Sequence, residues 1–154
     1  MKIYIAALAT ALTFATGFAE AYCVYNETDN SLYASQTGGF EGDGFTGMAK
    51  TIKPDGKECC NWKTDDCNHK GKKTSDVFFM IRPDSNKDST LQCGESKGSY
   101  PVVWFDAAGY AKVVKNPDYD KDKFSNAANP KYKVIAYNAD GKRSKVWGCH
   151  RGWA

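Results

Sequence analysis

The feature that most constrains this 154-residue chain is its set of six cysteines, three of which fall within KECCNWKTDDCNH, Lys57 to His69. An even number of cysteines in an exported chain is typical of a disulfide framework. The same residues in a reducing compartment more often bind metal or act in catalysis. The role of the cysteines therefore depends on the compartment. The six are Cys23, Cys59, Cys60, Cys67, Cys93 and Cys149.

The start of the chain has the pattern of a secretory signal peptide. Lys2 supplies a positive charge, residues 3–18 are almost all apolar or small, and residues 19–21 read Ala-Glu-Ala, the small-x-small form of a cleavage site. The apolar run is short beside the about 20 residues that a membrane span needs. We expect a secreted, extracellular protein without a transmembrane segment. Residues 1–21 would be the signal peptide and residues 22–154 a single domain.

Secretion favours disulfides over a metal site in the KECCNWKTDDCNH segment. Cys59, Cys60, Cys67 and His69 could supply three sulfur ligands and one nitrogen ligand to zinc, yet their spacing is not that of a CxxC knuckle. The adjacent aspartates lack the alternating oxygen ligands of an EF-hand loop. We therefore expect a disulfide staple with an exposed loop, and neither a metal nor a cofactor.

The positions of the cysteines suggest part of their pairing. A bond between the neighbours Cys59 and Cys60 would be strained, so each is expected to have a different partner. On a strand their side chains would point to opposite faces, so one could bridge a core and the other fasten a local loop. A bond between Cys23 and Cys149 would join the two ends of the mature chain. Six cysteines allow about 15 pairings, and the full map stays open.

The mature chain has the pattern of a protein built from short strands. Eight segments are rich in Val, Ile, Tyr, Phe and Trp, which suit a pleated, half-buried surface. They are 22–26, 32–36, 48–53, 77–82, 100–105, 110–115, 132–138 and 144–149. No segment shows a sustained helical period with caps. We therefore expect an all-β fold, a disulfide-stapled sandwich or barrel.

Turn residues separate these segments. KPDGK predicts a Pro-Asp-Gly turn, and DAAGY and NADGKR have the pattern of hairpin tips. The glycine-rich stretch 38–47 and the polar stretch 117–130 are predicted to be loops. Trp104, within the apolar run PVVWF, is expected to be buried.

Asn26 begins the one N-x-S/T sequon of the chain, Asn-Glu-Thr. In a secreted eukaryotic protein such an asparagine could carry a glycan, which would place it on the surface. The alternative is an unused sequon, and the sequence favours neither.

The first half of the mature chain resembles small cysteine-rich secreted fungal proteins, which are similar to thaumatin-like β-sandwich domains. The resemblance rests on VYNETDNSLYASQ, an IKP-G turn, CCNWKTDDCN and the apolar strand DVFFMI. It implies a fungal source and a role as an effector or elicitor that acts on a host.

A second resemblance covers NPKYKVIAYNADGKRSKVWGCHRGW near the other end. This segment is similar to the C-terminal part of secreted fungal guanyl-specific ribonucleases and ribotoxins. The likeness implies that His150 is a general acid and that Lys133 takes the place of a phosphate-binding arginine, without the bidentate fork of arginine. Asp106 is the nearest counterpart of the catalytic glutamate.

Charge and motifs favour binding over catalysis. The net charge of +3 is modest and the charges are well mixed, unlike the dense basic surface of a nucleic-acid binder. The sequence has no G-x-S-x-G elbow, no H-E-x-x-H and no phosphate-binding glycine loop. Exposed aromatic residues can stack on sugars or anchor a protein contact, and Trp62 and Trp153 are the candidates.

We therefore expect a non-enzymatic effector or elicitor that binds a host or cell-surface protein or glycan. Two alternatives are a ribonuclease-like protein, active or degenerate, and a glycan- or lipid-binding lytic protein.

Overall fold

The computed structural model of the chain describes residues 21–37, 47–83, 101–123, 129–144 and 146–147. Within these ranges the chain forms nine strands and no helix. The strands are β1 (Ala21–Glu27), β2 (Leu32–Thr37), β3 (Ala49–Ile52), β4 (Lys57–Asn61), β5 (Asp76–Pro83), β6 (Val102–Asp106), β7 (Tyr110–Lys115), β8 (Tyr132–Tyr137) and β9 (Val146–Trp147). The described part of the chain thus offers no helix that could cross a membrane.

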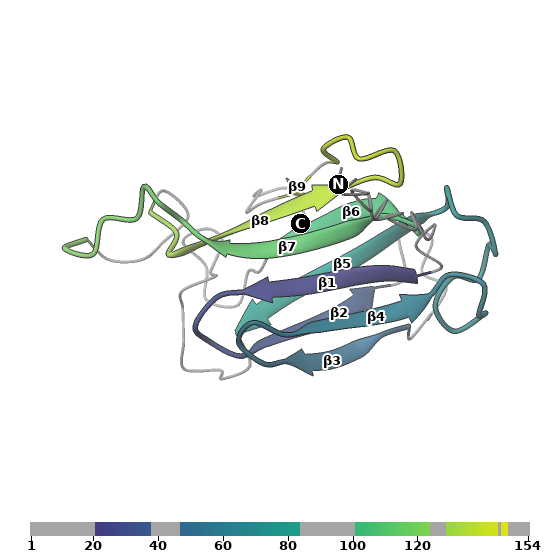
Figure 1. Cartoon of the computed structure of the whole chain (residues 1–154), viewed down its shortest axis with the longest axis horizontal. Coiled ribbons are helices and arrows are strands. Elements are labelled where there is room, and N and C mark those ends of the chain that lie inside the picture. Colours follow the sequence, from purple (N-terminus) through teal and green to yellow (C-terminus); the bar gives the residue numbers. More distant parts are fainter. Residues whose placement is uncertain (1–20, 38–46, 84–100, 124–128, 145, 148–154) are drawn as a thin grey trace, which may run out of the picture.

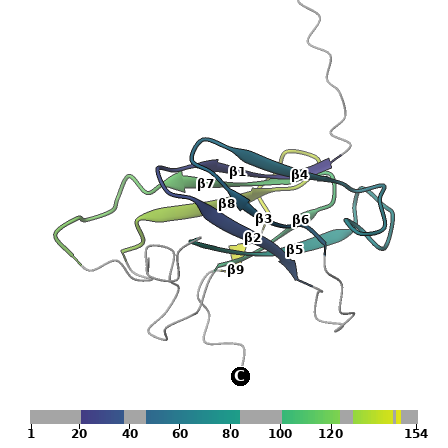
Figure 2. The same ribbon diagram turned by 90° about the horizontal axis from the view of Figure 1, so that it is seen from below.

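The strands form two facing sheets. One sheet has the order β4-β1-β7-β8 and the other the order β3-β2-β5-β6-β9. Neighbouring strands are antiparallel, except that β1 lies parallel to β7. Figure 2 shows the two layers from below, with β1 and β7 above β2 and β5. The expected all-β fold is confirmed, and because the two sheets are open it is a sandwich.

The strands and turns match those predicted from the sequence, with two exceptions. The eight expected segments correspond to all strands except β4, whose sequence KECCN shows little apolar alternation. DAAGY was expected to be a hairpin tip, which is wrong: it links β6 in one sheet to β7 in the other. Turn residues predict that the chain reverses its direction, but they do not predict which sheet the next strand joins. The NADGKR hairpin is confirmed by the bridge between Tyr137 and Arg143.

Alternating side chains fill the space between the sheets. Tyr22 from β1 meets Phe79 of β5 edge-to-face, with ring centroids 5.3 Å apart, and Phe79 stacks on Phe105 of β6 at 5.7 Å. All three side chains are fully buried. Edge-to-face and stacked pairs add to the hydrophobic burial that holds the layers together.

One end of the sandwich is held by the side chain of Asn26, near the end of β1. At this end the β1–β2 connection and the β3–β4 turn both pass from one sheet to the other. The Asn26 amide nitrogen lies within 3.0 Å of three carbonyl oxygens, those of Asn30, Ile52 and Lys53. Its backbone N–H donates to the carbonyl of Gly56 at 2.8 Å. Asn26 therefore fastens both crossings to β1.

The burial of Asn26 excludes the surface position that a glycan would need. The side chain is fully buried, and its Oδ1 accepts hydrogen bonds from the Thr28 N–H at 3.1 Å and the Thr28 hydroxyl at 2.6 Å. A glycan on Nδ2 would displace the bonds to the three carbonyl groups. The sequence left a glycan and an unused sequon as equal alternatives, and the burial of the Asn26 side chain favours the unused sequon.

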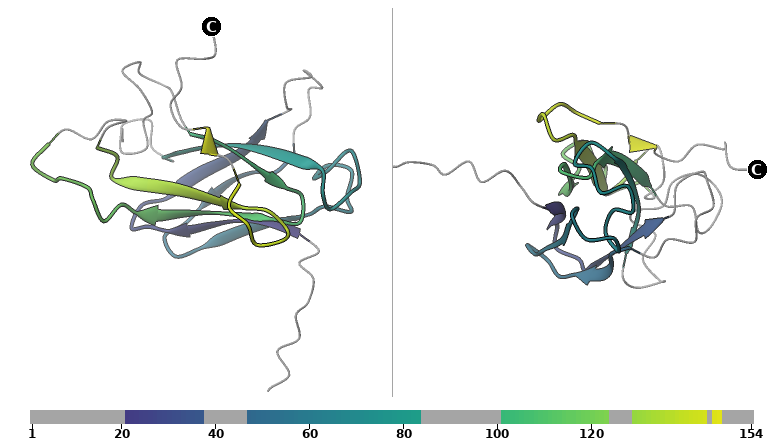
Figure 3. Two further views of the ribbon diagram at one scale, coloured as in Figure 1. Left: turned by 90° about the horizontal axis from the view of Figure 1, so that it is seen from above. Right: turned by 90° about the vertical axis from the view of Figure 1, so that its right-hand side faces the viewer.

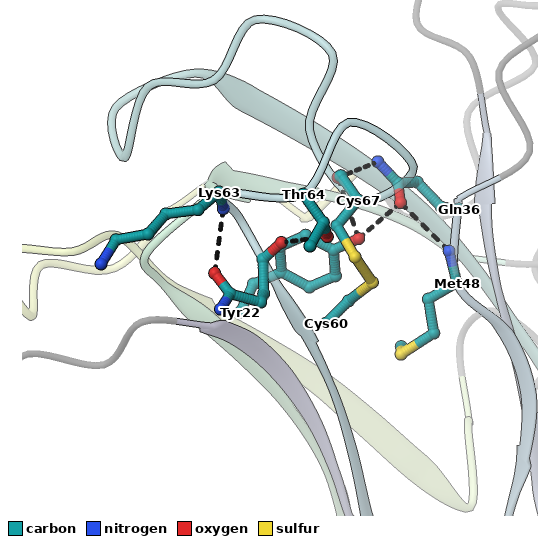
Figure 4. The surroundings of a disulfide bond; sticks show 8 residues. Tyr22, Gln36, Met48, Cys60, Lys63, Thr64 and Cys67 are labelled. Carbon is teal, nitrogen blue, oxygen red and sulfur yellow. Dashed lines mark hydrogen bonds between the residues drawn. A yellow bond between two sulfur atoms is a disulfide. The ribbon is translucent and has the colours of Figure 1, made fainter.

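The loop at 62–75 lies at the opposite end of the sandwich (Figures 1 and 3). A second buried polar cluster beside this loop holds that end. The Tyr22 hydroxyl donates to Gln36 Oε1 at 2.6 Å and lies 3.0 Å from the carbonyl of Cys67. Gln36 Nε2 donates to the same carbonyl at 3.0 Å, and the Met48 N–H donates to Gln36 Oε1 at 3.3 Å. Figure 4 shows the cluster beside the Cys60–Cys67 disulfide. The cluster joins both sheets to the disulfide loop.

The substitution Asn26→Asp tests the first cluster. It would turn a carboxylate oxygen toward three carbonyl oxygens in a buried site, and the free energy of unfolding should fall by about 3–5 kcal/mol. Chemical denaturation measures the change. The matched control is Asn61→Asp at an exposed turn, where Oδ1 still accepts the Lys63 N–H and the change should be within about 0.5 kcal/mol. Similar losses in both variants would contradict the role given to Asn26.

The substitution Tyr22→Phe tests the second cluster through pH. Burial raises the pKa of the Tyr22 phenol, whereas the unfolded phenol ionises near its ordinary value of about 10. The stability that the buried Tyr22 phenol contributes is therefore fully present below about pH 10. It is lost progressively above that pH, because only the unfolded state ionises there.

Chemical denaturation of wild type and Tyr22→Phe is measured at neutral pH and at about one pH unit above the ordinary tyrosine pKa. Between the two pH values, the free energy of unfolding of wild type should fall by about 1 kcal/mol more than that of Tyr22→Phe. Tyr33→Phe on the outer surface is the matched control and should follow wild type. An unchanged alkaline loss in Tyr22→Phe would contradict the explanation.

Candidate functional site: the tyrosine face

The described cysteines form two disulfides, Cys23–Cys59 and Cys60–Cys67. The expectation that the neighbours Cys59 and Cys60 have different partners is confirmed. The suggested bond between Cys23 and Cys149 is wrong, because Cys23 lies opposite Cys59 in the β1–β4 pair. Cys93 and Cys149 lie outside the described residues.

The KECCNWKTDDCNH segment is a strand followed by a stapled loop. Cys59 and Cys60 belong to β4, and the Cys60–Cys67 bond closes the loop. His69 contacts Asp65 at 3.3 Å, and both side chains are exposed. Among the residues that the structure describes, no group of three histidine, cysteine or acidic side chains is placed to hold a metal ion.

The structure does not bring together the described residues of the ribonuclease resemblance. Lys133 lies on β8 in the four-stranded sheet, where its ammonium group contacts Asp118 at 2.7 Å. Asp106 ends β6 in the five-stranded sheet and accepts a hydrogen bond from the Ala139 N–H at 3.3 Å. His150 lies outside the described residues.

Of Trp62 and Trp153, the two tryptophans predicted to contact a ligand, the structure describes Trp62 alone. Trp62 is half-buried and packs against the core, and the Lys63 ammonium group lies 5.6 Å from its ring centroid. Trp153 lies outside the described residues. The expectation that Trp104 is buried is wrong: its neighbours Val103 and Phe105 point into the core, so Trp104 lies on the outer surface. There its indole N–H donates to Asp76 at 2.6 Å.

Three aromatic residues gather on the outer surface of the four-stranded sheet, and all three are tyrosines. Tyr25 of β1, Tyr110 of β7 and Tyr137 of β8 all point outward from the four-stranded sheet, because their neighbours along each strand point inward. We call these three residues, with Lys57 of β4 and Lys112 of β7, the tyrosine face. The three tyrosines are half-buried rather than covered.

The three rings are in contact across the strands. Tyr110 and Tyr137 are direct neighbours in the β7–β8 pair, and their rings stack with centroids 4.8 Å apart. Tyr25 meets Tyr110 edge-to-face at 5.9 Å. Such contacts restrict the aromatic side chains in the free protein. Binding a ligand would then cost little further side-chain entropy. The face is therefore a preorganised aromatic surface.

Two lysines accompany the Tyr25 ring. Lys57 and Lys112 pair with Tyr25 from the strands on its two sides, and each ammonium group lies 5.8 Å from the ring centroid. Lys112 also contacts Glu27 at 2.7 Å. The hydrogen bond to Glu27 raises the pKa of Lys112 above its ordinary value, so Lys112 is charged at neutral pH.

Sequence reasoning did not find this face. Each tyrosine is the one outward aromatic residue in its part of a strand, and the three are far apart in the sequence. Only the register of β1 beside β7 and of β7 beside β8 brings them together. The available signal was alternation, since Tyr25 and Tyr110 directly flank residues that had to point inward.

Gly109 fixes the register that aligns the tyrosines. A Cβ at this position would lie 2.2 Å from the carbonyl oxygen of Tyr137. The close approach sets the start of β7 against the end of β8, where Tyr110 faces Tyr137. Only glycine allows this contact.

Replacing Gly109 with alanine should disturb both stability and the face. The clash is with backbone, so the free energy of unfolding should fall by about 2–3 kcal/mol in chemical denaturation. Gly71→Ala is the control, because that site has open space and a φ of 61°, and strain alone should lower stability by about 1 kcal/mol. Equal losses would show that the contact with Tyr137 is unimportant.

No protein-family model, curated protein or solved structure matches this chain. The functional argument therefore starts from the tyrosine face itself.

Proposed function

We propose that this protein is an extracellular, non-enzymatic binding protein, an effector or elicitor, whose ligand is a glycan of a host or cell surface. The observation that carries the proposal is the contiguous cluster of Tyr25, Tyr110 and Tyr137 on the outer surface of the four-stranded sheet. The tyrosine face would be the binding surface.

The cysteine chemistry supports an extracellular location. The described cysteines are all in disulfides, and disulfides persist in oxidising compartments such as the extracellular space. The signal-peptide pattern of residues 1–21 points to the same compartment. Both bonds involve β4, an edge strand of the sheet that bears the face, so they would preserve the face outside the cell.

The chemistry of the face supports a glycan as ligand. A sugar ring has an apolar C–H surface and a rim of hydroxyl groups, and it needs aromatic carbon beside hydrogen-bonding groups. The tyrosine rings supply the carbon, and their hydroxyl groups and the lysine ammonium groups supply donors. The rings are held by one another, so little side-chain freedom would be lost on binding.

Binding is favoured over cleavage by the placement of the candidate catalytic residues. Acid–base chemistry needs two groups within reach of one substrate atom. Lys133 and Asp106 belong to different sheets, and each already contacts a group beside it. The tyrosine face contains no carboxylate pair, and Glu27 beside it is engaged by Lys112.

Removing two rings from the face should abolish most of the binding. Against a panel of neutral and acidic polysaccharides in affinity electrophoresis, the Tyr110→Ala/Tyr137→Ala double variant should bind at least about tenfold more weakly than wild type. Both residues lie on the surface, and thermal unfolding should confirm that the variant remains folded.

The matched control is Tyr33→Ala. Tyr33 is a half-buried tyrosine on the outer surface of the five-stranded sheet, with the Arg82 guanidinium 4.3 Å from its ring centroid. Its loss should leave polysaccharide binding unchanged. The proposal would be contradicted by binding that survives the double variant, by no binding to any polysaccharide, or by RNA cleavage that His150→Ala abolishes.

A further inference from the structure

The tyrosine face is flanked by cations from two strands. In the aligned row across the sheet, Lys57 of β4, Tyr25 of β1 and Lys112 of β7 are direct neighbours. Adjacent strands are about 4.8 Å apart, so the two lysines start from backbone positions roughly 10 Å apart. Both ammonium groups lie near the same ring, at 5.8 Å from its centroid.

These cations are not fully neutralised within the described part of the chain. Lys112 contacts Glu27, but the side chains are 35% and 47% exposed, so water screens the pair. No described carboxylate lies within ion-pair distance of Lys57, whose ammonium group contacts the Tyr25 ring. Outside the tyrosine face but on the same side of the sheet, Lys133 contacts Asp118, which is 78% exposed. The surface therefore keeps a positive character around the rings.

The hydrogen-bonding groups of the face are mostly donors. An ammonium group has three donors and no acceptor, and a phenol can donate one hydrogen bond. Donors beside positive charge favour ligand groups that are anionic and accept hydrogen bonds, and charge-assisted bonds to such groups are stronger than neutral ones. The groups with this chemistry on sugar chains are carboxylates and sulfates.

We propose that the ligand of the tyrosine face is an anionic polysaccharide, with its sugar rings against the tyrosines and its carboxylate or sulfate groups beside Lys57 and Lys112. This inference rests on the proposed function and narrows its ligand class. The net charge of +3 and the mixed charges of the chain favour such a ligand over nucleic acid, which proteins bind through a denser set of cations. The charged rim likewise disfavours insertion into a lipid bilayer.

The double variant Lys57→Gln/Lys112→Gln tests the inference while leaving all three rings in place. Binding is measured for wild type and the variant with polygalacturonate as the carboxylate probe, dextran sulfate as the sulfate probe and a neutral β-glucan. Loss of two exposed charge contacts should weaken binding to the preferred anionic probe by about five- to tenfold. Added salt should weaken wild-type binding as the screening length shortens from about 10 Å to about 3 Å.

The matched control is Lys70→Gln/Lys72→Gln, which removes the same charge from exposed positions in the loop at 62–75 and should leave binding close to that of wild type. Thermal unfolding of both double variants checks that they are folded. The carboxylate and sulfate probes distinguish the two sources of negative charge, and preference for either supports the inference.

Other outcomes separate this inference from the proposed function. Tyrosine-dependent binding to the neutral glucan without an effect of salt or of the lysines would overturn the anionic ligand and leave glycan binding intact. Loss of binding that is equal in both lysine variants would overturn the role of Lys57 and Lys112. Tighter binding to single-stranded DNA or to phosphatidylserine vesicles than to any polysaccharide would overturn both proposals.

Discussion

The buried amide of Asn26 is the interaction on which the two-layer arrangement depends. A sandwich whose chain passes repeatedly between sheets must bring carbonyl groups into the interior at each crossing, and an unpaired buried carbonyl is costly. One amide nitrogen faces the carbonyl groups of both crossings at its end of the molecule, from Asn30, Ile52 and Lys53. The Tyr22–Gln36 cluster performs the same task at the other end.

Strand β1 stabilises the fold with its inward side chains and contributes to the candidate site with its outward side chains. Asn26 points inward and fastens the crossings, whereas its neighbour Tyr25 points outward between Lys57 and Lys112. Because successive residues of a strand point to opposite faces, the position of Tyr25 is fixed by the hydrogen bonds of Asn26. A shift of β1 by one residue would bury Tyr25 and expose Asn26. The internal polar contacts therefore determine the geometry of the outer surface.

The sequence could predict the elements of this fold but not how they combine. Composition and alternation predicted eight of the strands, because β-branched and aromatic residues mark them locally. The strand KECCN was not predicted, because its sequence shows no clear alternation of apolar and polar residues. For Asn26 the sequence left a glycan and an unused sequon as equal alternatives, since nothing in Asn-Glu-Thr shows that its amide meets carbonyl groups far along the chain. The tyrosine face was missed for the same reason: the parallel contact of β1 with β7 is non-local, and no turn residue encodes it.

That parallel contact has a consequence for when the surface comes into existence. Glu27 and Lys112, which meet beside the face, are 85 residues apart in the chain. Contacts over such separations form late, after the entropy of closing a long loop has been overcome. A growing or partly unfolded chain carries Tyr25 and Tyr110 without the surface that they form together. The face is thus a property of the finished molecule alone, so ligand binding would select completely folded copies and stabilise them against opening of the central strands.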